Sequence, residues 1–203
     1  MLRRPGKIVM ASSNAGKLRE IASILGDLGI AVVPQSDFNV DDADETGATF
    51  VENALIKARH AAKATGLAAI ADDSGLAVDA LNGRPGVYSA RYAGADADDE
   101  KNIDKLLAEL DGLADEQRGA AFHCAACLVL PDEPEVIVAE GEWRGRILRA
   151  RRGDAGFGYD PVFFDPELGC SSAQLSAAQK NARSHRGQAF RELARKLGEL
   201  QWK

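Results

Sequence analysis

The chain has 203 residues, of which 45% are hydrophobic and 28% are charged, and its formal net charge at pH 7 is −6. This composition is typical of a globular protein, and the length suits one sizeable core. The acidic balance argues against a surface that coats nucleic acid, because such surfaces are normally basic. No apolar stretch approaches the ~20 residues of a membrane-spanning helix. We therefore expect neither nucleic acid nor a membrane as a partner.

The N-terminus and the cysteines indicate the cellular compartment of the protein. Met1 to Pro5 is basic, but no apolar region of signal-peptide length follows, so we expect no secretion. The three cysteines, an odd number, fit a reducing cytoplasm. Cys124 and Cys127 form a C-x-x-C pattern within a strand-like run, where residues three apart point to opposite faces. We interpret them as small buried residues, with zinc or redox chemistry as the alternative.

A strand, a small polar loop and a helix are expected near the start of the chain. Lys7–Met10 is apolar, the loop runs from Ala11 to Lys17, and apolar residues then recur at helical spacing, namely Leu18, Ile21, Ala22, Leu25 and Leu28. This layout directs backbone N–H groups and a helix N-terminus toward an anion. The loop departs from a P-loop, because Ala11 replaces a glycine and Leu18 replaces a hydroxyl residue. An ordinary strand–helix turn is the alternative.

A second strand, Ile30–Val33, ends at Pro34, and an acidic stretch leads into the next predicted helix. Thr46 or Thr49 can cap that helix, whose apolar face carries Phe50, Ala54, Leu55, Ala58 and Ala61. Glu45 falls close to the helix start, so its carboxylate can reach toward a cation. Most of the acidic stretch is interpreted as a solvated face.

The most informative stretch follows the apolar run Leu67–Ile70, which is typical of a buried strand. Asp72, Asp73, Ser74 and Gly75 then place two carboxylates and a hydroxyl where we expect that strand to stop. In open α/β sheets, ligands bind outside the carboxyl ends of the strands. Paired carboxylates there either hold a hard cation such as Mg²⁺ or act as acid and base. A surface turn is the alternative.

The middle of the chain predicts further regular elements. Val87–Tyr92 alternates like a strand or a loop edge, and Asp96–Asp111 predicts an amphipathic helix. Two long strand-like runs, Ala120–Leu130 and Glu135–Leu148, suggest a hairpin. The basic run from Arg149 to Arg152 is either a solvated loop or part of a field that attracts an anion.

Two C-terminal stretches are candidates for nucleotide binding. Glycines on both sides of Phe157 allow its ring to lie against a flat ligand, since aromatic faces stack on bases; a turn with a buried aromatic is the alternative. Ser176 and Gln179 form a capping-box pattern at the start of a helix that bears Lys180. His185 can donate a hydrogen bond to a base carbonyl, although a structural histidine is the alternative.

Taken together, these stretches closely resemble the Ham1/RdgB family of inosine/xanthosine triphosphate pyrophosphatases, nearly from end to end. The resemblance also includes Glu45-Thr46-Gly47, Phe50–Ala54 and Pro85–Arg91. It implies one α/β domain over residues 1–203, with an elongated mixed β-sheet flanked by helices and two lobes around a nucleotide cleft. It also implies a homodimer and Mg²⁺-dependent hydrolysis of non-canonical purine triphosphates to the monophosphate and pyrophosphate. Gly169-Cys170-Ser171 departs from relatives, which often have a basic residue after this glycine.

The resemblance implies a role for each matching residue. Asp73 would be the proton acceptor and a magnesium ligand, with Glu45 as a second carboxylate. The substrate would be bound by Ser12, Ser13, Asn14, Ala15, Gly16, Lys17, Ser74, Phe157, Gly158, Tyr159, Asp160, Lys180, His185 and Arg186. Among these, the segment Ser12–Lys17 would hold the phosphates, and the residues from Phe157 onward would bind chiefly the base.

Two other functions compete with this interpretation. A related triphosphate pyrophosphatase of the Maf type would share a loop-and-carboxylate core but prefer pyrimidines or modified bases. A nucleotide-binding sensor would bind without turnover. The stretches around Phe157 and His185 argue against the first, and Asp73 together with Lys17 argues for turnover.

Overall fold

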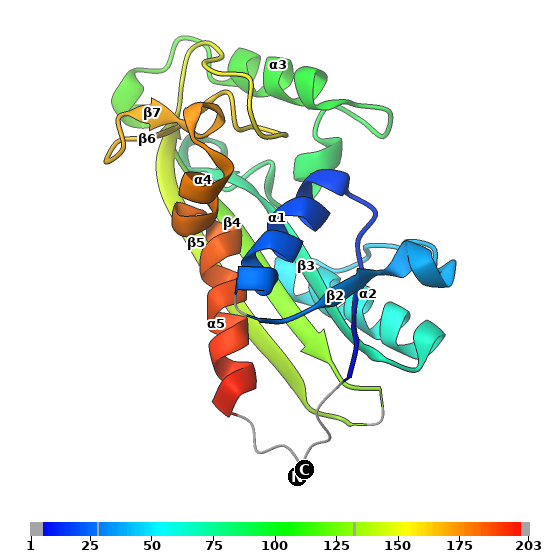
Figure 1. The fold of residues 1–203 in the computed structure, drawn as a ribbon. Helices are drawn as coiled ribbons and strands as arrows, with labels where there is room; N and C mark the ends of the chain where they lie inside the picture. The colour runs from blue at the N-terminus through cyan, green and yellow to red at the C-terminus, as the bar shows by residue number, and fades with distance from the viewer. Residues whose placement is uncertain (1–5, 28, 132, 200–203) are drawn as a thin grey trace. The chain divides into compact units, whose positions relative to one another are not determined.

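The computed structural model describes residues 6–27, 29–131 and 133–199, so Leu28 of the first predicted helix lies outside the described residues. The chain divides into two compact units. Unit 1 comprises Met1–Asp73, Cys124–Gly141 and Arg186–Lys203. Unit 2 comprises Ser74–His123 and Glu142–His185. Figure 1 shows the chain as a ribbon.

Seven strands form one mixed sheet in the order β2-β1-β3-β4-β5-β6-β7. Their bounds are β1 Ile8–Met10, β2 Val32–Pro34, β3 Ala68–Val78, β4 Gly119–Val129, β5 Val136–Ile147, β6 Phe163–Asp165 and β7 Cys170–Ser171. Strand β1 runs parallel to β2 and β3, whereas β6 runs antiparallel to β5 and β7. The predicted mixed α/β sheet is therefore confirmed.

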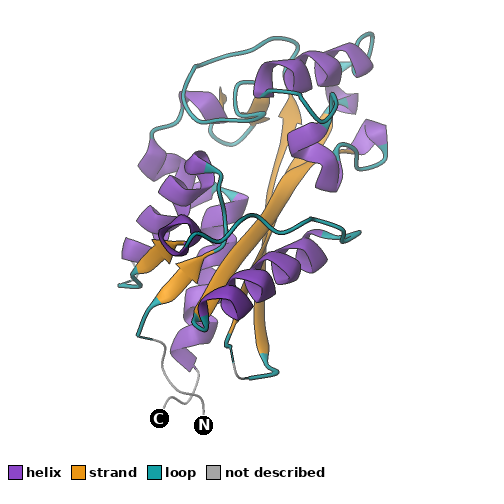
Figure 2. Cartoon of the chain, turned by 90° about the vertical axis from the view of Figure 1, so that its right-hand side faces the viewer, coloured by secondary structure: helices purple, strands orange, loops and turns teal. Residues whose placement is uncertain are grey.

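Unit 1 has helices on both faces of its strands, as Figure 2 shows. Helices α1 (Ala15–Asp27) and α5 (His185–Glu199) pack on one face, where Ile21, Leu25 and Phe190 meet Met10 and Ile70. Helix α2 (Phe50–Thr65) covers the other face with an alanine-rich stripe that packs against Val9, Ala69 and Ala71. Because side chains alternate along a strand, each strand supplies both cores.

Helix α2 has well-defined ends that fix where its side chains lie. Thr49, not Thr46, is its N-cap, and the Thr49 side chain accepts a hydrogen bond from the Glu52 amide in a complete capping box. Gly66 ends the helix in the left-handed conformation, which glycine adopts without steric cost. The predicted apolar face is confirmed at Ala54, Ala58 and Ala61, all fully buried.

Unit 2 has its own apolar core, which includes residues from the first half of β4 and the second half of β5. Helix α3 (Asp99–Glu109) is capped by Asp98 and buries Ile103 and Leu106. Trp143 and Phe163 are the largest fully buried side chains there. Helix α4 (Ala177–Arg183) begins with the predicted capping box at Ser176. The 3₁₀ helices in the described residues are η1 Gln35–Phe38, η2 Asp79–Leu81, η3 Gly86–Arg91, η4 Asp115–Gln117 and η5 Ser172–Gln174.

Two predicted elements differ from the structure. Strand β3 does not stop at Ile70 but continues through both aspartates to Val78. Asp72 and Asp73 can stand inside a strand because cationic side chains meet each of them, as described below. Val87–Tyr92, expected as a strand or a loop edge, is not a strand: η3 (Gly86–Arg91) covers most of it. The Ser89 hydroxyl fixes that turn by donating to the Gly86 carbonyl at 2.6 Å and accepting from the Leu76 amide at 2.9 Å.

The two cysteines of the C-x-x-C pattern lie in different apolar clusters of unit 1, with Cys124 beside residues of α1 and α5 and Cys127 beside Ala54 of α2. The strand geometry therefore separates them, as predicted. In the described part of the chain, no helix is both long enough and apolar enough to span a bilayer.

Candidate active site

In the loop between β1 and α1, side chains accept hydrogen bonds from backbone amides at the start of the helix. The Asn14 side chain accepts from the Lys17 amide at 2.9 Å, and the Ser12 hydroxyl oxygen accepts from the Asn14 amide at 3.2 Å. Ala15, Gly16 and Lys17 form the first turn of α1. Ser13 is exposed and donates to Asp42. The loop thus presents the start of a helix, which favours an anion.

Asp72 lies on one face of β3, buried among cations of unit 1. Its Oδ2 atom is 3.1 Å from the Lys17 Nζ atom and 3.5 Å from the Arg186 Nε atom. Arg186 also pairs with Glu20. Burial alone raises the pKa of Asp72, but the charges of Lys17, Arg186 and Lys57 outweigh it and hold that pKa well below its usual range. Asp72 is therefore ionised and tethers Lys17 beside the loop.

Asp73 lies on the opposite face of β3, because adjacent residues of a strand alternate. Its Oδ2 atom accepts from the Asn53 amide side chain at 3.1 Å, and its Oδ1 atom is 3.4 Å from the Lys57 Nζ atom. Lys57 is also 2.7 Å from Glu45 Oε1. Asn53 is itself held by the Gly47 amide, which donates to its side-chain oxygen at 2.8 Å.

The environment of Asp73 favours a proton acceptor. Burial raises its pKa, and Glu45 adds to that effect, although Lys57 and Lys17 oppose it; the net result is a raised pKa. A raised carboxyl pKa strengthens the group as a base. Burial lowers the pKa of Lys57, but the negative charges of Asp72, Asp73 and Glu45 outweigh it, so Lys57 stays protonated.

Glu45 and Asp73 form a donor set that suits Mg²⁺. Both carboxylates already share one cation, the Lys57 ammonium. Among the residues that the structure describes, no group of three or more His, Cys, Asp and Glu side chains is arranged to hold a metal ion. That finding is compatible with Mg²⁺, which is usually bound through one or two carboxylates plus substrate phosphates and water. The two predicted ligands therefore fit this metal.

In unit 2, Asp160 organises the loop that carries Phe157. Its carboxylate accepts from the Phe157 amide at 2.9 Å, from the Ser172 hydroxyl at 2.8 Å and from the Lys180 ammonium at 2.5 Å. The same ammonium lies 4.7 Å from the centre of the Phe157 ring. Gly156 has φ = +83°, and a Cβ atom there would lie 2.1 Å from Asp160 Oδ2, so only glycine fits.

The remaining predicted residues of unit 2 have different environments. Tyr159 is buried in the core, and its hydroxyl donates to the Ser89 carbonyl at 2.8 Å, so only its backbone can contact a ligand. The Gly158 amide donates to Asp99 at 2.7 Å. Ser74 is half-buried, inside β3 rather than beyond its end.

His185 and Arg186 are neighbours in sequence but have different partners. The imidazole of His185 stacks on Phe122 within unit 2, with ring centres 4.8 Å apart and an angle of 12° between the planes. Arg186 is buried in unit 1 beside Asp72 and Glu20. Adjacent helical residues point about 100° apart, which explains the divergence. The structure places the Arg186 guanidinium in the carboxylate network with Asp72 and Glu20, and a contact of Arg186 with the base stays a prediction.

Sequence reasoning missed Asn53, Lys57, Glu20 and the role of Asp72. Two of these were within reach. Asn53 and Lys57 are four residues apart on α2 and therefore share a helix face, and a polar pair on the face beside an alanine stripe is a recognisable signal. Glu20 is 166 residues from Arg186 in sequence, and no local pattern predicts that pairing.

Comparison with known proteins identifies the family. The model of the Ham1 family matches residues 8–196. The chain is 56% identical over 188 residues to a dITP/XTP pyrophosphatase of Pectobacterium atrosepticum, covering 92% of this chain and 95% of that protein. It is 56% identical over 194 residues to a dITP/XTP pyrophosphatase of Vibrio vulnificus, covering 95% and 97%.

A solved structure agrees with these relatives. The structure of a HAM1 protein from Coxiella burnetii has a TM-score of 0.87 and 50% sequence identity, and the match covers 98% of this chain and 100% of that one. Sequence and fold therefore give the same assignment over nearly the whole length: the chain belongs to the Ham1 family.

Proposed function

We propose that this protein hydrolyses non-canonical purine nucleoside triphosphates, such as dITP, ITP and XTP, to the monophosphate and pyrophosphate, with Mg²⁺ as cofactor. The observation that carries the proposal is the ion-pair cluster of Asp73, Lys57 and Glu45, of which Asp73 is buried, in a chain whose relatives are named dITP/XTP pyrophosphatases. It supplies a proton acceptor with a raised pKa beside a fixed cation.

Charge balance supports the need for a divalent cation. The described ion-pair network around β3 in unit 1 has three cations (Lys17, Lys57, Arg186) and four carboxylates (Glu20, Glu45, Asp72, Asp73), an excess of one negative charge if all are ionised. A triphosphate tail adds several more negative charges. Mg²⁺ held by Glu45 and Asp73 would supply the charge neutralisation that phosphoryl chemistry requires.

The chain's own residues divide the remaining work. Asp73 accepts a proton from the attacking water, and Asn53 fixes the orientation of its carboxylate. Lys17, held by Asp72, offsets the charge that grows on departing pyrophosphate, and the amides at the start of α1 bind the phosphate oxygens. Such positioning and charge compensation supply most of the rate enhancement in phosphoryl transfer.

Selection of the base follows from hydrogen-bond polarity. Hypoxanthine and xanthine carry a carbonyl acceptor at position 6, whereas adenine carries an amino donor. A donor from His185 or from loop amides would pair with the carbonyl and be left unpaired by adenine, at a cost of about 1–3 kcal/mol. Phe157 is half-buried beside Lys180, so part of its ring is open to stack on the base.

A substrate panel with pyrophosphate detection tests this proposal. We expect kcat/KM for ITP, dITP and XTP to exceed that for ATP, GTP, dTTP and UTP, and we expect EDTA to abolish turnover. A preference for dTTP or UTP would favour the Maf-type alternative. Tight ITP binding without magnesium-dependent turnover would favour the sensor.

We also propose a homodimer in a reducing cytoplasm. The described cysteines are all free, and two of them are buried thiols whose pKa values are raised by burial, to about 12 for Cys127. Light scattering on the purified protein measures the assembly, and a monomer at micromolar concentration would contradict the dimer.

A further inference from the structure

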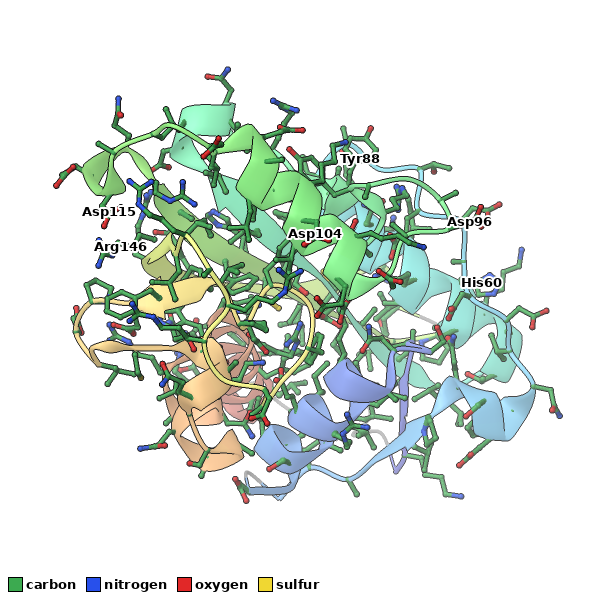
Figure 3. The ribbon with its side chains drawn as sticks, turned by 90° about the horizontal axis from the view of Figure 1, so that it is seen from above. His60, Tyr88, Asp96, Asp104, Asp115 and Arg146 are labelled. Atoms are coloured by element: carbon green, nitrogen blue, oxygen red, sulfur yellow. The ribbon has the colours of Figure 1, made fainter. Side chains whose placement is uncertain are left out.

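Unit 2 contains a pocket in which arginines gather. It has a volume of about 170 Å³ and lies where β5 ends, beside the 3₁₀ helix η4. Figure 3 shows two of its wall residues, Asp115 and Arg146, close together. None of its wall residues is among those predicted to bind the nucleotide. The walls are formed by Asp115, Arg146, Ile147, Leu148, Arg149, Ala150 and Arg152.

Positive charge exceeds negative charge around this pocket. One carboxylate, Asp115, serves two arginines: its oxygens lie 2.9 Å from Arg149 Nε and 3.5 Å from an Arg146 guanidinium nitrogen. Arg149 also donates to the Leu113 carbonyl at 2.8 Å. Within the part of the chain that the structure describes, Arg152 forms no ion pair. The walls therefore carry three guanidinium groups against one carboxylate.

A fourth guanidinium, that of Arg118, contacts the backbone of residues that line the pocket. Arg118 is 2% exposed and donates to the carbonyl oxygens of Ile147 at 2.8 Å, Leu110 at 2.6 Å and Leu148 at 2.9 Å. Two of those residues, Ile147 and Leu148, line the pocket. Backbone carbonyls satisfy the N–H groups of Arg118, but they do not cancel its positive charge. Burial, together with the charge of Arg149, lowers the pKa of Arg118.

The other arginines nearby are paired differently. Arg151, next in sequence to the pocket residues, lies 2.8 Å from Glu100 and 2.7 Å from Asp104. Arg144 pairs with Glu142 and Asp79. A chain with a net charge of −6 has enough carboxylates to pair with its arginines in this way. The shortage of carboxylate partners is therefore confined to the four arginines at the pocket, Arg118, Arg146, Arg149 and Arg152.

We propose that this pocket binds a small phosphate-type oxyanion, held by the guanidinium groups of Arg146, Arg149 and Arg152. Guanidinium forks match phosphate oxygens with paired, charge-assisted hydrogen bonds. The volume equals roughly the share of five or six water molecules in the liquid, and it is below the roughly 300–1,000 Å³ of pockets that enclose drug-sized ligands. Orthophosphate or pyrophosphate therefore fits within it. The inference stands independently of the proposed catalytic function.

Equilibrium dialysis with labelled pyrophosphate, in EDTA and at constant ionic strength, tests the pocket. We expect the double variant Arg149→Gln/Arg152→Gln to bind at least tenfold more weakly than the unmodified protein. Arg151→Gln is the control at a neighbouring position outside the pocket: it removes one positive charge where the double variant removes two, and its affinity should change less than twofold. The Lys17→Ala variant, which alters the loop of unit 1, should retain the pocket-dependent binding.

A second variant tests the sign of the electrostatic effect. Asp115→Asn removes the only carboxylate of the walls, so we expect it to bind pyrophosphate several-fold more tightly, even though it weakens native contacts. If circular dichroism shows that the double variant does not fold, the pyrophosphate affinity of Asp115→Asn tests the proposal. Parallel titrations with orthophosphate distinguish the two ligands, and the tighter binder is the assigned one.

Three results would overturn the proposal. One is equal pyrophosphate affinity in the double variant and the unmodified protein. Another is an equal loss in Arg151→Gln, which would indicate general screening of surface charge. The third is weaker binding by Asp115→Asn.

Discussion

The candidate residues of unit 1 and of unit 2 are held in place by different forces. Around β3 in unit 1, buried carboxylates and cations form a charged network in which Asp72 and Asp73 each contact a lysine. In unit 2, one carboxylate, Asp160, fixes a loop, while aromatic rings contribute flat surfaces. A charged network suits phosphate chemistry, and flat rings with directed donors suit base selection. The comparison predicts that the two sets fail differently when mutated.

Removing the charge of Asp73 should have the largest effect on turnover. Asp73→Asn preserves the shape of the side chain but removes the proton acceptor, and general-base contributions are typically about 10²–10⁴-fold. We expect kcat for ITP to fall by that factor, measured by pyrophosphate release, while ITP binding persists. Asp104→Asn, a change at an exposed carboxylate of α3, is the control and should leave kcat unchanged. Near-normal turnover by Asp73→Asn would remove Asp73 from the mechanism.

Removing the charge of the buried Asp72 should lower the free energy of unfolding more than removing the charge of any exposed carboxylate would. Asp72→Asn leaves Lys17 and Arg186 without their shared buried partner, and breaking a buried ion pair typically costs about 3–5 kcal/mol. Urea unfolding at pH 7 measures this loss in the free energy of unfolding. Arg186 keeps Glu20, so the lower end of the range is expected.

Asp72 should also make the stability of the fold depend on pH, in a direction that its pKa determines. The pKa of Asp72 in the folded protein lies below its ordinary value of 3.8. Its contribution to stability is therefore fully present above about pH 4 and is lost as the pH falls toward the folded pKa. The unmodified protein should lose more stability than Asp72→Asn between pH 4 and pH 2. Parallel acid titrations of the two proteins would contradict the assigned ionisation.

Loss of the half-buried Phe157 ring of unit 2 should weaken substrate binding rather than the chemical step. Stacking of one base on an aromatic side chain is worth about 1–3 kcal/mol, so Phe157→Ala should raise KM for ITP roughly 5- to 150-fold. Phe157→Tyr should restore most of the affinity, because it keeps the ring. Phe38→Ala, at another partly exposed phenylalanine, should change neither constant. An unchanged KM in Phe157→Ala would exclude stacking.

The smallest effect is expected at the end of the helix that carries Asn53 and Lys57. Thr49→Ala removes the N-cap hydrogen bond to the Glu52 amide and should lower the free energy of unfolding by about 1 kcal/mol. Thr46→Ala, at the other candidate cap, should change it by less than about 0.5 kcal/mol. Thermal unfolding measures both. Equal effects of the two substitutions would show that α2 does not depend on its capping box.

Local patterns predicted much of this fold because the relevant physics is local. The capping box at Ser176, the amphipathic face of α3 and the separation of Cys124 from Cys127 follow from helical and strand periodicity. The length of β3 was mispredicted, because the Asp-Asp-Ser-Gly stretch is typical of a turn. Only cations supplied from α1, α2 and α5 make those carboxylates tolerable inside a strand.

The candidate site was predictable in part, for the same reason. The loop before α1 and the carboxylates were found as residue types, but their pairing depends on contacts between distant segments. Arg186 meets Glu20 across 166 positions of sequence, and Lys57 meets Asp73 across 16. In the arginine pocket, Asp115 pairs with Arg146 and Arg149, which lie 31 and 34 positions later, and a basic run alone does not reveal the hollow between them.

The extended backbone of β3 fixes which aspartate does which task. A shift of the strand by one residue would send every side chain to the other side of the sheet. The first aspartate would then meet α2 and the second would meet α1, so each would exchange its lysine for the other's. Deleting or inserting one amino acid between Ala68 and Asp72, if the rest of β3 keeps its pairing, is thus equivalent to swapping two functional groups at once.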